Sequence, residues 1–151
     1  MSPTPTAESS EVYIDGASRG NPGPAGMGVV FVDAQGKPVT QLHKYLGETT
    51  NNVAEYLALL YALHEAHARG IHQLTVKTDS ELLTKHLHGQ YKVRDGTLRL
   101  FHDLALQMAK GFTSLHIEHV SRRHNTLADR LAAEAIESRF DTSLKLVERG
   151  T

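Results

Sequence analysis

The chain has 151 residues, with 16 Lys and Arg, 17 Asp and Glu and no cysteine. This length suits one domain, and 40% apolar with 22% charged residues is typical of a globular protein. The lack of cysteine excludes disulfides, thiol nucleophiles and thiolate metal sites, so a bound metal must have oxygen or imidazole ligands. A net charge of −1 excludes a protein-wide positive field, so binding of a nucleic acid would need a local patch.

No segment of the sequence indicates a membrane span or a signal peptide. No apolar run approaches the roughly 18 residues of a span, and Met1–Ser10 lacks the basic-then-apolar order of a signal peptide. We expect a cytoplasmic monomer with no membrane partner. Residues 1–10, rich in Ser, Thr and Pro, are predicted to be a disordered tail, and residues 11–138 are predicted to be one folded domain. Residues 139–151 form a second tail, and the sequence does not determine whether it has a regular structure.

Three strands are predicted at the start of the domain. Glu11–Asp15 and Val39–Leu46 alternate in hydrophobicity, and Met27–Val32 is a β-branched run that follows a glycine. Asp33–Gly36 supplies the turn between the second and third strands. The three strands should therefore form an antiparallel meander.

A long helix is predicted next, from the capping residues Thr49–Asn52 to Arg69–Gly70. Its apolar residues form two stripes, which predicts a central helix covered on both sides. The later predicted elements are a strand at Gln73–Thr78, helices at Ser80–His88 and Thr97–Lys110, a strand at Leu115–Val120 and a helix at Asn125–Ser138.

The predicted order βββαβααβα belongs to the α/β class. Because a whole helix precedes the fourth strand, this strand should enter by a right-handed crossover and lie parallel to the first. We expect a five-stranded mixed sheet, antiparallel in its first three strands and parallel in the remainder, flanked by helices. Asp15 and Asp79, at the ends of the first and fourth strands, would then lie side by side where open α/β sheets bind ligands.

Two more acids are candidates for the same site. Two adjacent carboxylates repel each other unless a cation or a shared proton compensates. Glu55 shares its side of the long helix with Leu59, and a buried unpaired carboxylate is costly. Asp129 follows the start of the last helix. Taken singly, each acid is more often a cap or a surface charge, so the prediction depends on the four together. Such an oxygen cluster is typical of Mg²⁺ or Mn²⁺, and two such ions can promote phosphodiester hydrolysis.

Four blocks of the sequence resemble, in order, the signatures of type 1 ribonuclease H. They are Tyr13–Gly26, Thr49–Tyr56, Thr78–Ser80 and Asn125–Ala132. The likeness covers about residues 11–137 and implies a ribonuclease H-like fold. It also implies that the four acids hold two Mg²⁺ ions, with Mn²⁺ as a substitute. The implied reaction is cleavage of the RNA strand of an RNA–DNA hybrid to 5′-phosphate and 3′-hydroxyl ends.

The same resemblance implies a set of substrate contacts. They are Gly16, Ser18, Asn21, Thr50, Asn51 and Asn52. The first two would approach the RNA 2′-hydroxyls, which distinguish RNA from DNA. Asn51 and Asn52 would read the minor groove, with helix capping as the alternative interpretation. Asn21 and Thr50 would hold a phosphate of the DNA strand, although the segment Gly20–Pro24 is also interpretable as a rigid turn.

The sequence departs from the family pattern at two places. Many bacterial members carry a basic, Trp-bearing protrusion where this chain has the short segment Gly89–Gly96, which predicts weaker substrate affinity. The loop Val120–Asn125 is also shorter than the loop that often carries a mobile histidine. His124 or Arg122 is the candidate to assist product release in its place.

Two other functions remain open at this point. A related DNA-processing nuclease would share such an acidic cluster, and a non-catalytic domain could bind hybrids without cutting them. Four carboxylates argue against the binding domain, because phosphate binding without a metal requires positive charge.

Overall fold

The computed structural model describes residues 9–139, so all but residues 9, 10 and 139 of the predicted tails 1–10 and 139–151 lies outside the described range. Its elements, in chain order, are β1 (Ser9–Ser18), β2 (Gly23–Val32), β3 (Pro38–Thr49), α2 (Asn51–Ala68), β4 (Gln73–Thr78), α3 (Glu81–Leu87), α4 (Gly96–Ala109), β5 (Ser114–His119), the 3₁₀ turn η1 (Arg122–His124) and α5 (Thr126–Glu137). The predicted element order is confirmed, with η1 added. No helix among these is long and apolar enough to cross a membrane.

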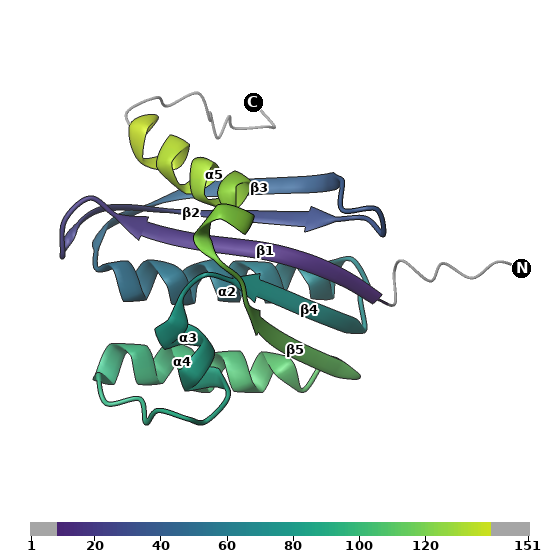
Figure 1. Cartoon of the computed structure of the whole chain (residues 1–151). Coiled ribbons are helices and arrows are strands. Elements are labelled where there is room, and N and C mark those ends of the chain that lie inside the picture. Colours follow the sequence, from purple (N-terminus) through teal and green to yellow (C-terminus); the bar gives the residue numbers. More distant parts are fainter. Residues whose placement is uncertain (1–8, 140–151) are drawn as a thin grey trace, which may run out of the picture.

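One five-stranded sheet has the strand order β3-β2-β1-β4-β5. The strand β2 is antiparallel to both β1 and β3, whereas β4 is parallel to both β1 and β5. The predicted mixed sheet is therefore confirmed. Helices α2 and α4 lie on one face of the sheet and α5 lies on the other (Figure 1).

The main core lies between the sheet and α2. Val12 and Ile14 of β1 are fully buried there and pack in one cluster with Leu59 and Leu63 of α2. Alternate residues of β1 face this side because successive strand side chains point to opposite faces. Burial of this large apolar surface fixes α2 on the sheet.

The opposite face has a much smaller core beneath α5. Val30 and Val32 of β2 pack there against Leu131 of α5. Gly28 brings the helix close, since a Cβ at this position would lie 2.3 Å from the carbonyl oxygen of Ala128. The short distance between α5 and β2 depends on the missing side chain.

Several predicted boundaries are wrong at glycine-rich or polar ends. The strand β1 begins at Ser9, inside the segment predicted to be a tail, and continues to Ser18. The strand β2 begins at Gly23 rather than Met27. Pairing with β4 extends β1 back to Ser9 and pairing with β2 carries it on to Ser18, while pairing with β3 extends β2 back to Gly23.

The expected covering of α2 on both sides is met only in part, because the residues of the first stripe are divided between the core and solvent. Tyr61 is 37% exposed, and His64 and Ala68 of the same stripe are exposed as well. The buried face carries small residues such as Ala58 and Ala62, which let the helix backbone lie close to the sheet. Of the first stripe, Leu60 is buried and Val53 and Leu57 pack against the core, so only its more exposed residues border solvent.

Candidate active site

The site begins where β1 and β4 separate. Their last paired residues are Ile14 and Thr78, and each of these two residues is followed at once by an aspartate. Asp15 continues along β1 opposite Gly28, and Asp79 is the first residue after β4. The parallel pairing therefore places these two carboxyl groups next to each other, as the sequence predicts.

Glu55 enters the site from the first turns of α2. Thr50 caps this helix, its hydroxyl oxygen accepting a hydrogen bond from the Val53 amide at 3.2 Å. The amide of Gly16 donates to the Glu55 carboxylate at 3.1 Å. A Cβ on Gly16 would lie 2.3 Å from the Ala54 carbonyl, so only glycine allows this approach. Gly16 thus positions Glu55 through its backbone.

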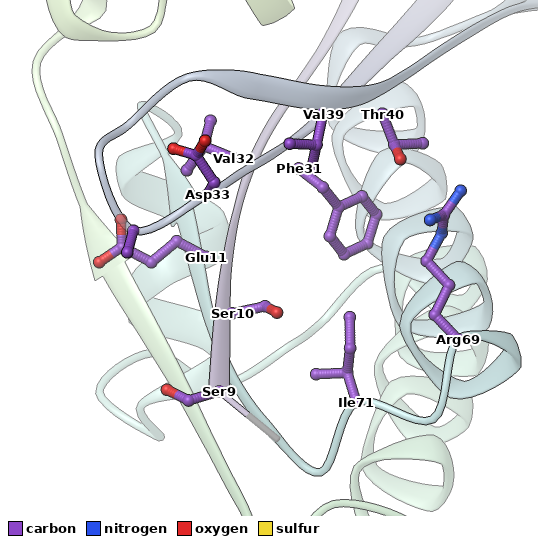
Figure 2. A pocket seen from close by; sticks show the side chains of 11 residues that line it. Ser9, Ser10, Glu11, Phe31, Val32, Asp33, Val39, Thr40, Arg69 and Ile71 are labelled. Atoms are coloured by element: carbon purple, nitrogen blue, oxygen red, sulfur yellow. The ribbon is translucent and has the colours of Figure 1, made fainter. Parts of the chain in front are cut away.

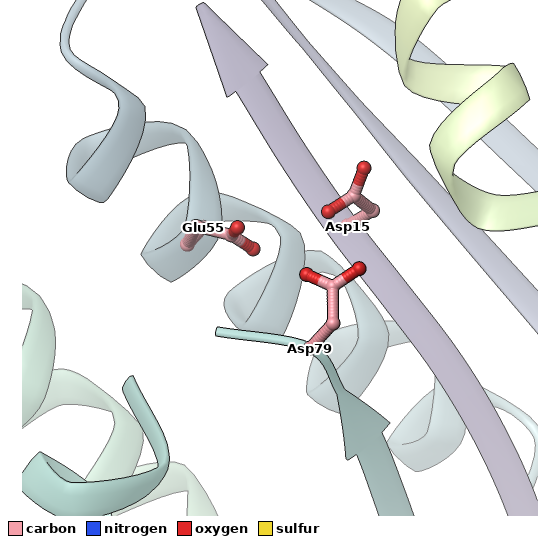
Figure 3. A group of neighbouring side chains, drawn as sticks. All are labelled: Asp15, Glu55 and Asp79. Atoms are coloured by element: carbon pink, nitrogen blue, oxygen red, sulfur yellow. The ribbon is translucent and has the colours of Figure 1, made fainter. Parts of the chain in front are cut away.

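Three carboxyl groups converge at this point. One oxygen each from Asp15, Glu55 and Asp79 lies within 4.8 Å of the others. Figure 3 shows the three side chains pointing toward one another from β1, α2 and the end of β4. Asp15 and Glu55 are 4% and 5% exposed, and Asp79 is partly buried. These positions bring like charges together in a region poorly reached by water.

Burial and mutual repulsion alter the acid–base behaviour of the group. Burial, with repulsion from Glu55 and Asp79 and a hydrogen bond with Asp129, raises the pKa of Asp15 to about 9. Burial and repulsion from Asp79 raise the pKa of Glu55 to about 8, against opposing effects of the Gly16 amide and Arg122. Without a cation, the protein therefore retains protons here at neutral pH. An all-oxygen set of this charge fits a divalent cation such as Mg²⁺.

Asp129 lies beside this group rather than inside it. It is on the first turn of α5, is exposed, and interacts with Asp15 through a side-chain hydrogen bond. The site therefore has a buried side formed by three carboxyl groups and an open side with a fourth.

Comparisons with known proteins agree with this geometry. The family model described as "Reverse transcriptase-like" matches residues 13–135. Ribonuclease HI of Halobacterium salinarum is 42% identical over 125 residues, which cover 83% of this chain and 63% of that protein. The crystal structure of RNase H1 from the same archaeon superimposes with a TM-score of 0.83 at 41% identity, covering 86% of this chain and 98% of the other. The chain belongs to the ribonuclease H family.

A second structural relative is similar over nearly its whole length. LC11-RNase H1, solved in complex with an RNA/DNA hybrid, has a TM-score of 0.83 and 38% identity, with coverage of 87% of this chain and 99% of that chain. The bifunctional protein Rv2228c of Mycobacterium tuberculosis is 40% identical over 128 residues, or 84% of this chain and 35% of that protein. This ribonuclease H family member thus spans 63% and 35% of these two curated relatives.

In this family member, Arg122 and His124 have different surroundings. Arg122 is the cation whose positive charge opposes the rise in the pKa of Glu55. The His124 ring shares a 2.7 Å hydrogen bond with the Ser121 hydroxyl, and His124 also lines a cavity with Tyr13. Of the two candidates, Arg122 is the one electrostatically linked to the site.

The turn after β1 and the start of α2 lie side by side. The Asn21 side chain accepts a hydrogen bond from the Asn51 amide at 3.2 Å, next to the helix cap Thr50. The Ser18 hydroxyl can donate to the Thr49 carbonyl at 2.8 Å and is also in hydrogen-bonding contact with the Gly20 carbonyl. The predicted phosphate-binding pair of Asn21 and Thr50 is thereby brought together.

Asn51 and Asn52 occupy the exposed first turn of α2. Because Thr50 provides the side-chain cap, helix capping does not account for these two residues. Their exposure next to Asn21 leaves them accessible from solvent on the side of the turn.

Sequence reasoning missed one residue of the site, Asn125. It is 1% exposed and its side-chain amide donates to the Asp79 carboxylate at 3.4 Å. The sequence suggests only a helix start at this position. Its place in the fourth block, four residues before Asp129, is the signal that could have drawn attention to it.

A cavity of about 590 Å³ lies away from the acids. It is lined by residues at the start of β1, the end of β2 and the end of α2, among them Phe31, Arg69 and Ile71 (Figure 2). None of the three converging carboxyl groups lines it. The candidate active site therefore lies outside this cavity.

Proposed function

We propose that this chain is an endonuclease that hydrolyses the RNA strand of RNA–DNA hybrids and leaves 5′-phosphate and 3′-hydroxyl ends. The observation that carries the proposal is the convergence of Asp15, Glu55 and Asp79 within 4.8 Å. It is supported by 38% identity to LC11-RNase H1, which has been solved with an RNA/DNA hybrid.

The four acids divide into two groups that suit two divalent cations. Asp15, Glu55 and Asp79 would hold one ion, and Asp15 with Asp129 would help to hold the other, with Mg²⁺ as the natural ion and Mn²⁺ as a substitute. Bound cations supply activation of a water molecule and stabilisation of the leaving oxygen. The raised pKa values of Asp15 and Glu55 indicate that the fold gathers more negative charge than it neutralises itself.

The chain's own groups would orient the substrate and assist departure of the product. The Gly16 amide holds Glu55, while the Ser18 hydroxyl and the surrounding backbone would meet the RNA 2′-hydroxyls. Arg122, on the side of Glu55, would attract the anionic product as it leaves. His124 is the weaker candidate because Ser121 already engages its ring.

The DNA strand would be recognised at the junction of the β1–β2 turn and α2. Asn21 and Thr50 would hold a phosphate, and the exposed side chains of Asn51 and Asn52 would contact the minor groove. We place catalysis in residues 11–138 of a cytoplasmic monomer. The short Gly89–Gly96 segment would make its affinity for substrate weaker than that of members with a basic protrusion.

The proposal is tested by comparing substrates of one sequence: an RNA–DNA hybrid, double-stranded RNA and duplex DNA. Each is incubated with Mg²⁺, with Mn²⁺ and with excess EDTA. We expect cleavage of the hybrid RNA alone, loss of cleavage in EDTA and recovery when Mg²⁺ is restored. The Asp15→Asn variant is the inactive control. Mapping of the product ends must give 5′-phosphate and 3′-hydroxyl groups.

Two outcomes would replace the proposal. Preferred cleavage of duplex DNA would favour a DNA-processing nuclease. Binding of the hybrid in Mg²⁺ without cleavage would favour a non-catalytic binding domain. Near-native turnover by the Asp15→Asn variant would show that cleavage does not require the acidic group.

A further inference from the structure

Asn125 occupies the N-cap position of α5, but its side chain does not make an N-cap hydrogen bond. It precedes α5, where an asparagine side chain ordinarily accepts a hydrogen bond from an amide of the first turn. The α5 terminus has no side-chain cap of this kind. The residue is nevertheless 1% exposed, so its amide group must serve another purpose or be buried at a cost.

The Asn125 side chain instead links the two strand ends of the acidic site. Its Nδ2 donates to the Ile14 carbonyl at 2.8 Å and lies 3.4 Å from Oδ2 of Asp79. Ile14 directly precedes Asp15 and is paired with Thr78, which directly precedes Asp79. One amide group thus spans the point at which β1 and β4 separate, and the start of α5 is tied to both.

The orientation of this amide follows from its partners. Both contacts of Nδ2 are hydrogen-bond acceptors, so the reverse orientation would place Oδ1 against a carbonyl and a carboxylate. Oδ1 itself is buried and has no hydrogen-bond partner among the described residues. Burying a polar oxygen without a hydrogen-bond partner costs about 1–3 kcal/mol. The fold tolerates this cost at Asn125, beside Asp79.

We propose that Asn125 is a positioning residue for divalent-cation binding: it holds the Asp79 carboxylate toward Asp15 and thereby increases the affinity of the acidic group for the ion. Groups that hydrogen-bond to a metal-ligating carboxylate fix its orientation, and their loss typically lowers metal affinity or activity about 10–100-fold. The inference rests on the proposed function, since it takes Asp79 as a cation ligand.

The test uses the full chain without substrate. Binding of Mn²⁺ to metal-free protein is measured from the electron paramagnetic resonance signal of free Mn²⁺. Two variants are compared: Asn125→Leu, which keeps the approximate shape without hydrogen-bonding atoms, and Asn125→Ala. Thr126→Ala, an exposed neighbour, is the control. Circular dichroism and thermal unfolding in EDTA report whether each variant is folded.

We expect the Mn²⁺ dissociation constant to rise about tenfold or more in the folded Asn125 variants and to stay unchanged in Thr126→Ala. The Mg²⁺ concentration for half-maximal hybrid cleavage should rise in parallel. A folded variant at Asn125 that binds Mn²⁺ as tightly as the unaltered chain would overturn the inference. If the unaltered chain itself neither binds Mn²⁺ nor cuts the hybrid, the proposed function has failed instead.

Discussion

Under α2 the sheet carries large apolar side chains, whereas under α5 it carries glycine where the helix comes closest. The α2 face contains the main cluster, with Ile14 and Leu59 fully buried, while the α5 face relies on Gly28 and a few valines. The acids that the two helices contribute differ in the same way: Glu55 of α2 is buried, and Asp129 of α5 is exposed. The site therefore joins a rigid, desolvated half to an open half.

The largest expected difference is between Glu55, inside the buried group, and Asp129, beside it. Glu55→Gln should lower hybrid cleavage roughly 1000-fold, which corresponds to about 4 kcal/mol, because no water can take the place of the buried carboxylate. Asp129→Asn should lower it only roughly 10-fold, because the exposed position is open to solvent. Single-turnover cleavage at saturating Mg²⁺ measures both. Equal losses in the two variants would show that the halves of the site do not differ.

The buried half should also control the pH dependence of stability. The pKa values of Asp15 and Glu55 are raised to about 9 and about 8 in the folded chain, whereas unfolded carboxyl groups titrate near about pH 4. Between these limits the folded state binds more protons than the unfolded state, so the free energy of unfolding should fall as pH rises.

Urea unfolding in EDTA at about pH 5 and about pH 8 measures this slope. Added Mg²⁺ should restore stability at the higher pH, since the cation replaces the protons. The Asp15→Asn variant should be more stable than the unaltered chain at the higher pH and should show a flatter profile. A metal-free protein that gains stability over this range would contradict the assignment.

The two hydrophobic faces should respond differently to the same truncation. Leu59→Ala on the α2 face should cost about 3–4 kcal/mol, because its surroundings are closed on all sides. Leu131→Ala on the α5 face should cost about 2 kcal/mol, because it borders a small cluster at 7% exposure. Denaturant unfolding in Mg²⁺ compares them, and a larger loss at Leu131 would reverse our ranking of the two faces.

The last prediction concerns the close approach of α5. Gly28→Ala should destabilise the fold by about 1–3 kcal/mol, since the new methyl group would meet the Ala128 carbonyl. Gly96→Ala is the matched control, because open space surrounds that position at the start of α4. It should be neutral or stabilising by up to about 1 kcal/mol. Thermal unfolding distinguishes the two, and a neutral Gly28→Ala would mean that α5 can shift freely.

The sequence by itself determined the element order and the identity of the acids that converge. Gln73–Thr78 was predicted with its observed bounds, and the placement of Asp15 beside Asp79 followed from the rule for crossover connections. These features could be predicted because hydrophobic period, capping residues and connection length act locally along the chain. The four blocks then supplied the family, which the comparisons show independently.

Only the tertiary structure decided which residues lie at the ends of these elements and what their polar groups contact. Gly16 continues a strand that the local pattern ends at Asp15, at a point where a Cβ would lie 2.3 Å from the Ala54 carbonyl of α2. Asn125 resembles a cap in the sequence, yet it bonds to residues 111 and 46 positions away. Such contacts depend on the packing of distant segments, and no pattern confined to neighbouring residues encodes them.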